Sequence, residues 1–105
     1  MNAKTKKLLQ IAEVLRLAES LIEEFNTMEG NTKVVTAAIQ DDVSPVKLHL
    51  FGDVRHEIGI DFQTYPTQET AFYFVTEHMA HVDGVSIDYA DYDFKEAGER
   101  AKMVV

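Results

Sequence analysis

The chain has 105 residues, of which 46% are hydrophobic, and 18 acidic against 10 basic residues give it a net charge of −8. The length suits one compact α+β domain over residues 1–105, and the negative charge opposes direct binding to the phosphates of nucleic acids. There is no cysteine, which excludes disulfides and thiol nucleophiles. No apolar run approaches the roughly 20 residues that a membrane span needs. We therefore expect a cytoplasmic protein that binds neither nucleic acid nor a membrane.

A long helix is predicted from about Thr5 to Asn26. Apolar residues recur there at steps of three and four, which is the spacing of one helix face: Leu8, Ile11, Leu15, Ala18, Ile22 and Phe25. Four more apolar residues widen that face beyond what one sheet surface would cover: Leu9, Val14, Leu17 and Leu21. The helix is therefore expected to be covered on two sides or to contact another molecule, and a symmetric homodimer is the simplest such contact.

Three strands are predicted next, over 33–40, 46–51 and about 54–62, because these runs are rich in β-branched residues and are separated by turn-forming residues. The last two alternate apolar and polar residues. Their apolar members must share one side if both strands cover one core, which requires a hairpin loop of odd length. These members are Val46, Leu48 and Leu50, and Ile58, Ile60 and Phe62.

A second helix is predicted from Thr67 to about Asp83, because Thr67 suits an N-cap and the segment TEHMAH does not alternate as a strand would. The aromatic run FYFV leaves a strand as the alternative. Residues 85–89 alternate as a final strand, and the change of phase at Ala90 predicts a bulge or the end of that strand. The order α-β-β-β-α-β predicts an α+β fold, with about four mainly antiparallel strands and two helices on one face.

The histidines give the strongest hint of a metal site. His78 and His81 would lie one turn apart on the second predicted helix and could supply half of a zinc site. The sequence EHMAH lacks the arrangement of the HExxH motif, and no third ligand is evident. The serines have no GxSxG context, and GNTK at 30–33 is not a phosphate loop. We therefore predict no catalytic residue, no metal and no cofactor.

The stretch VSIDYADYDF, residues 85–94, combines aspartates with aromatic residues, and residues 67–94 hold six acidic residues and no lysine or arginine. Aromatic side chains supply contact area at interfaces, and aspartates steer basic partners. The predicted partner-binding residues are Asp88, Tyr89, Asp91, Tyr92, Asp93 and Phe94. An equally weighted alternative is that the aromatic residues cap the core and that the aspartates have no binding role and merely keep an edge strand from aggregating.

Three functions follow from these patterns. The first is an acidic protein-binding domain that imitates nucleic acid, such as an inhibitor of the phage or immunity type, in a basic groove of a larger nucleic-acid-handling protein. The second is a homo-oligomeric structural or assembly protein built on the first helix. The third is a small enzyme or metal-binding protein that uses His78 and His81.

Overall fold

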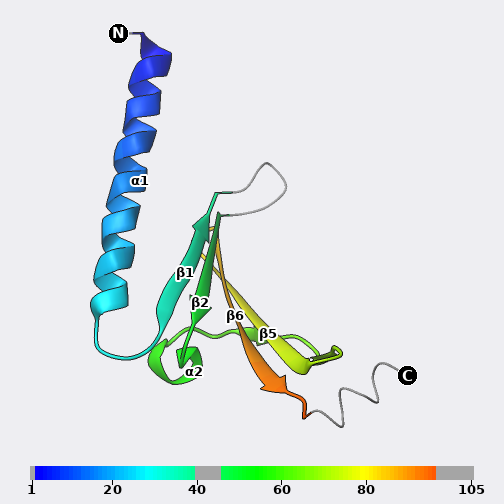
Figure 1. Cartoon of the computed structure of the whole chain (residues 1–105). Coiled ribbons are helices and arrows are strands. Elements are labelled where there is room, and N and C mark those ends of the chain that lie inside the picture. The colour runs from blue at the N-terminus through cyan, green and yellow to red at the C-terminus, as the bar shows by residue number, and fades with distance from the viewer. Residues whose placement is uncertain (1, 40–45, 97–105) are drawn as a thin grey trace.

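The computed structural model describes residues 2–39 and 46–96, and it confirms the α+β class (Figure 1). A long helix, α1 (Ala3–Thr27), is followed by β1 (Lys33–Ala38), β2 (Val46–Phe51) and the short helix α2 (Val54–Glu57). Four strands complete the described part of the chain: β3 (Gln63–Thr64), β4 (Gln68–Glu69), β5 (Tyr73–Val82) and β6 (Val85–Phe94). The described elements thus contain more strands than the sequence predicts, and only one long helix.

The strands form one mixed sheet in the order β1-β2-β6-β5-β3, with β4 also paired to β5. β2 and β6 run parallel, and the other pairs are antiparallel. The long hairpin of β5 and β6 is paired residue by residue from Val82 and Val85 to Tyr73 and Phe94. A mixed sheet with this order places β6 between β2 and β5.

Helix α1 begins where Asn2 caps it, since the Asn2 side chain accepts a hydrogen bond of 2.8 Å from the backbone N–H of Thr5. The helix then extends away from the sheet, and only its last turns approach β1 (Figure 1). The radius of gyration is 18.3 Å, compared with about 13 Å for a compact domain of about 100 residues. The predicted helix is confirmed, but its predicted packing on one face of the sheet is wrong: among residues 2–39 and 46–96, only its last turns meet the sheet.

The core lies on one face of the sheet. Leu50, Val54 and Tyr89 are its buried apolar centre, and four partly buried residues pack against them: Val34, Ile58, Phe62 and Ile87. Phe62 meets Tyr89 edge to face with ring centroids 4.9 Å apart. The core is therefore small and draws on β1, β2, β6 and the segment that begins with α2.

The prediction of a strand over 54–62 is wrong. Residues 54–57 form α2, and residues 58–62 continue without strand pairing. The side to which the apolar residues point was nevertheless predicted correctly, because Ile58 and Ile60 line the same apolar surface as Leu48 and Leu50. The alternation of apolar and polar residues predicted which side chains face the core. It did not predict the strand pairing, because β2 pairs with β1 and β6 and not with residues 58–62.

The prediction of a helix over 67–83 is also wrong, since β4 and β5 occupy that segment. The pair Asp83-Gly84 turns the chain with φ angles of 50° and 80°, the left-handed conformation of a two-residue hairpin turn. β5 lies inside the sheet and is partly buried on both faces, so its sequence does not alternate. The Asp-Gly pair was a hairpin signal and not the end of a helix.

The predicted bulge or strand end at Ala90 is wrong as well, because β6 continues with unbroken pairing to Phe94. Tyr89 faces the core, while Tyr92 and Phe94 lie on the opposite face by ordinary alternation. The sequence appeared to change phase there because the core face beyond Tyr89 carries Asp91 and Asp93 in place of apolar residues.

Candidate functional site: the unpartnered helix and the acidic hairpin

The exposed shaft of α1 is the main unpartnered apolar surface of the described chain. Seven of its large apolar side chains are between 49% and 65% exposed. They include the four that were predicted to widen the apolar face: Leu8, Leu9, Ile11, Val14, Leu15, Leu17 and Leu21. Exposed contiguous apolar surface of this kind usually marks a site of protein interaction.

Charge is segregated along α1. Lys4, Lys6 and Lys7 lie in its first turns, and no acidic residue precedes Glu13. Beyond Arg16 the charged residues of the helix are all acidic: Glu19, Glu23 and Glu24. Both ends oppose the helix dipole, which favours acidic side chains at the beginning of a helix and basic ones at its end.

The base of α1 is held by a set of polar contacts at the junction with β1. Asn26 binds the backbone of Val34 twice: its amide donates to the Val34 carbonyl at 3.1 Å, and its oxygen accepts from the Val34 N–H at 2.8 Å. Lys33 adds a bond from Nζ to the Asn26 carbonyl. The last turn of the helix is thus tied to the first strand.

Glu57 of α2 strengthens the same junction. Its carboxylate accepts from the N–H groups of Asn31, at 2.9 Å, and Thr32, at 2.7 Å. The Asn31 side chain in turn accepts from the N–H of Asp53 at 2.6 Å. The Thr32 side chain and these two N–H groups favour the ionised carboxylate and so lower the pKa of Glu57.

An apolar groove of about 270 Å³ lies beside this junction. One wall is the end of α1, with Leu21, Ile22 and Phe25, and the other wall belongs to the sheet and the segment after α2. The residues of the second wall are Val34, Leu48, Leu50, Ile58, Ile60 and Ile87. The core face of the sheet is therefore not fully covered by its own chain.

The structure divides the six predicted partner-binding residues between the two faces of β6. Tyr89, Asp91 and Asp93 point to the core face, and Asp88, Tyr92 and Phe94 point to the other. Tyr89 is only 6% exposed, whereas Tyr92 is 49% and Phe94 67% exposed. The six do not form one surface, and two aromatic residues remain accessible.

The accessible aromatic residues gather at the end of the hairpin with Tyr73 of β5. The Tyr73 ring lies 5.1 Å from that of Tyr92 and 5.7 Å from that of Phe94. We call Tyr73, Tyr92 and Phe94 the aromatic cluster. It lies on the face opposite the core, so it is separate from the apolar groove.

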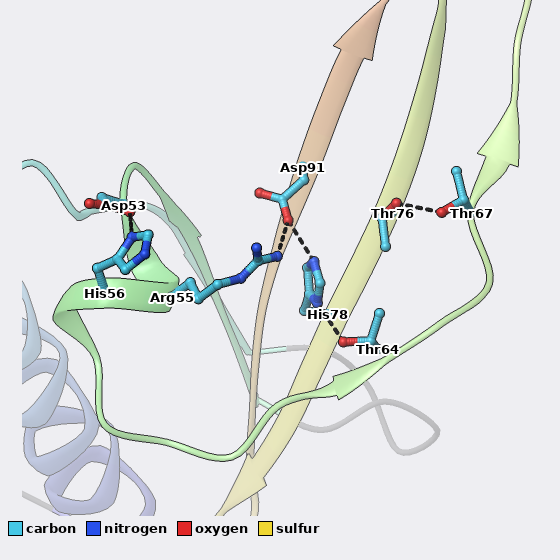
Figure 2. Close-up of polar contacts among 8 residues, drawn as sticks. All are labelled: Asp53, Arg55, His56, Thr64, Thr67, Thr76, His78 and Asp91. Carbon is cyan, nitrogen blue, oxygen red and sulfur yellow. Dashed lines mark hydrogen bonds and ion pairs between the residues drawn. The ribbon is translucent and has the colours of Figure 1, made fainter.

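Two of the aspartates have partners within the chain. Figure 2 shows that Asp91 binds both the Arg55 guanidinium, at 2.9 Å, and His78 Nε2, at 2.8 Å. On the opposite face, Asp88 binds His49 Nδ1. Part of the negative charge that the sequence showed is therefore used to hold neighbouring elements together.

His78 is 3% exposed and is stacked on Tyr89 with ring centroids 4.4 Å apart. Its Nδ1 lies 2.9 Å from the Thr64 hydroxyl (Figure 2). A neutral imidazole that donates from Nε2 to Asp91 accepts from Thr64 at Nδ1, so both ring nitrogens are satisfied. A carboxylate and a hydroxyl on one histidine could serve general-base chemistry.

Each bond of this arrangement also has a structural explanation. Thr64 is directly opposite His78 in the ladder between β3 and β5, and Arg55 shares Asp91. The cluster joins α2, β3, β5 and β6 beside a cleft of about 400 Å³. We assign it to holding these elements in place.

His78 and His81, considered above as a possible half of a zinc site, are not placed together. Both lie on β5, three positions apart, and therefore point to opposite faces of the sheet. Among residues 2–39 and 46–96, no group of three or more His, Asp or Glu side chains is placed to hold a metal ion.

The sequence analysis missed the residues that fix the direction of α1. The sequence pattern places Asn26 at the end of the helix and Glu57 in a predicted strand, and neither position indicates a role in the junction. The pairs Gly30-Asn31 and Gly52-Asp53 were the sequence signal for this junction, because both are typical of turns. Where two turns meet, their backbone N–H groups need side-chain oxygens as acceptors, here those of Glu57 and Asn31.

No helix in the described part of the chain is long and apolar enough to cross a membrane. Comparisons with protein-family models, curated proteins and solved structures found no match. The function is therefore argued from the geometry above.

Proposed function

We propose that this protein acts by binding rather than by catalysis, as a homo-oligomeric assembly domain that associates through α1. The observation that carries this proposal is the row of seven large apolar side chains on the shaft, each about half exposed or more. Fully burying one such side chain contributes about 1.5–3 kcal/mol, so covering the row would provide a substantial driving force for association.

The state of the helix supports the same conclusion. A helix of 25 residues is about 37 Å long. Most helical stability in proteins comes from packing an apolar face rather than from intrinsic propensity. Within the ranges that the structure describes, such packing reaches only the last turns of α1, so association would stabilise the rest of the helix.

The base of the helix is suited to this role. The bonds of Asn26 and Glu57 fix α1 relative to the sheet before any partner arrives. A pre-organised binding element loses less conformational entropy on association than a free one. These polar contacts therefore favour a binding helix over a loosely attached one.

Sedimentation equilibrium from low to high micromolar concentration tests the proposal. We expect a concentration-dependent oligomer that Val14→Glu disrupts, because burying an unpaired carboxylate costs on the order of 2 kcal/mol or more in each copy. Ser20→Glu is the matched control on the polar side of the helix and should leave the oligomer intact. A wild-type monomer at high micromolar concentration would refute the proposal.

The aromatic cluster supports a second function, the docking of a basic protein groove. Its specific basis is the exposure of Tyr92 and Phe94 at the end of an acidic hairpin, since residues 67–94 contain no lysine or arginine. Binding of this kind weakens as salt rises, because screening shortens the reach of the aspartates.

A partner captured on the wild-type protein would allow this second function to be tested. Asp93→Lys should slow association, and Tyr92→Ala should cost about 2 kcal/mol of binding if Tyr92 is a hot spot. Asp61→Lys makes the same charge change away from the aromatic cluster and should have less effect. Unchanged binding by both folded variants would leave the aspartates a structural role only.

A further inference from the structure

We infer that the partner of α1 is the α1 helix of a second copy, arranged antiparallel, with its first half in the apolar groove beside the base of the first copy. This inference rests on the proposed function and specifies its geometry. It is carried by the charge distribution along α1, the shape of the unfilled groove and the apolar character of the first half of the helix.

The charges select the direction. In a parallel pair, Lys4, Lys6 and Lys7 of one copy would lie beside the same lysines of the other, and acidic ends would likewise meet. An antiparallel pair places the basic beginning of each helix beside the acidic end of its partner, which carries Glu19, Glu23 and Glu24. This arrangement also supplies opposite charge to helix ends that carry the sign their dipole disfavours.

The groove fixes where the second helix lies. Leu21, Ile22 and Phe25 form one apolar wall, and the sheet forms the other, while the space between them is open. In an antiparallel pair, the residues that reach the end of one α1 are those at the beginning of the other. The first half of each helix would therefore fill the groove of its partner, and a twofold axis would relate the two contacts.

The first half of α1 is apolar on more than one side, as a helix placed between two apolar walls needs to be. Leu9 lies nine residues, or two and a half turns, from Ala18 and so points away from the main apolar face. Leu9 is nevertheless a large apolar side chain and is 50% exposed. One wall would cover the main face, and the other would cover Leu9.

Spin labels on single engineered cysteines test the direction, because the chain has no cysteine of its own. If residue 8 lies beside residue 25 of the partner, the twofold axis passes near residue 16. Lys6→Cys labels are then about ten residues from the axis and about 30 Å apart along the pair at 1.5 Å per residue. Arg16→Cys labels are the matched control and should be much closer, at about the spacing of two packed helices.

Groove occupancy is tested separately with Ile60→Lys, which places a charge in the wall of the groove. It should weaken the dimer at least tenfold, whereas Ile39→Lys, at an exposed isoleucine outside the groove, should not. If Ile60→Lys fails to fold, Ile60→Ala replaces it: removing this apolar side chain from the groove wall should still weaken the dimer, and an unchanged dissociation constant in that folded variant would overturn the groove contact.

The outcomes separate the two proposals. A dimer with short distances at both label positions would be parallel, which overturns the antiparallel arrangement but leaves assembly through α1 standing. A dimer with the expected distances that tolerates a folded Ile60→Lys would overturn the groove contact. A monomer would overturn both proposals.

Discussion

The α1 helix and the β5–β6 hairpin both carry exposed apolar side chains and unevenly distributed charge, but they differ in where their contacts lie. Asp88 and Asp91 of the hairpin bind side chains of other elements, and its Tyr89 is in the core. In the described part of the chain, the helix meets the sheet through its last turns, and the rest of its apolar side is exposed. Contacts within the chain thus account for Asp88, Asp91 and Tyr89 of the hairpin. They do not account for the exposed apolar side chains of α1.

The largest loss of stability is expected from a change inside the hairpin. Tyr89→Ala should destabilise the protein by about 3–5 kcal/mol, as expected for the loss of a buried aromatic side chain. It would remove the ring that meets Phe62 and stacks on His78. Tyr92→Ala is the matched change on the exposed face and should cost less than about 1 kcal/mol.

Urea unfolding at fixed protein concentration measures both variants. Equal destabilisation by the two would show that the aromatic cluster is as buried as Tyr89, for example under a partner. That result would weaken the contrast between the hairpin and the helix.

The base of α1 provides the next test. Gly52 has φ of +117°, and a Cβ added there would lie 2.2 Å from the carbonyl oxygen of Asn31. Gly52→Ala should therefore cost at least about 1–3 kcal/mol, because both the left-handed backbone and the close approach are lost. Gly59→Ala is the control, since a Cβ at Gly59 meets no atom within 4 Å.

This junction determines why the apolar residues of α1 are exposed. If α1 were loosely attached, disorder would explain their exposure and no partner would be needed. Thermal unfolding reports the stability of the two variants. A Gly52→Ala protein as stable as Gly59→Ala would show that the junction is not tightly closed.

A smaller effect separates the paired from the unpaired part of the acidic stretch. Asp91→Asn should cost about 1–2 kcal/mol, since it weakens the bonds to Arg55 and His78 and leaves the buried imidazole with a poorer acceptor. Asp93→Asn, at an exposed position of the same strand, should change stability by less than about 0.5 kcal/mol. If both variants unfold like the wild type, Asp91 does not hold the hairpin to α2.

The sequence predicted the helix well because its periodicity is long and regular, and the structure confirms α1 within two residues at each end. It also predicted that Leu9, Val14, Leu17 and Leu21 are more than one sheet face needs, and all four are exposed. The width of the apolar face of a helix can be predicted from the spacing of its own residues, without knowledge of the rest of the fold.

The hairpin could not be read in the same way. Strands β5 and β6 are flanked on both sides and are partly buried on both faces, so hydrophobic alternation is weak in them. Asp83-Gly84 could have signalled the turn, but the aromatic and histidine-rich run before it matched helical spacing equally well. The contact of Asp88 with His49 depends on pairing between β2 and β6, which are far apart in sequence, and that of Asp91 with Arg55 depends on the position of α2.

The last and smallest expected effect is a pH dependence that comes from the base of α1. Hydrogen bonds from the junction lower the pKa of Glu57 below its ordinary value of 4.5. A group whose pKa is lowered on folding stabilises the protein above its unfolded pKa, and that contribution is lost as pH falls through the folded pKa. Wild type should therefore be more stable than Glu57→Gln near neutral pH, and the two should converge as pH falls below about 4.5. Urea unfolding at a series of pH values, with the exposed Glu77→Gln on the hairpin as the control, measures this convergence. A constant difference between wild type and Glu57→Gln down to low pH would mean that the carboxylate does not carry the junction, and the base of α1 would then be held by its other contacts, those of Asn26 and Lys33 among them.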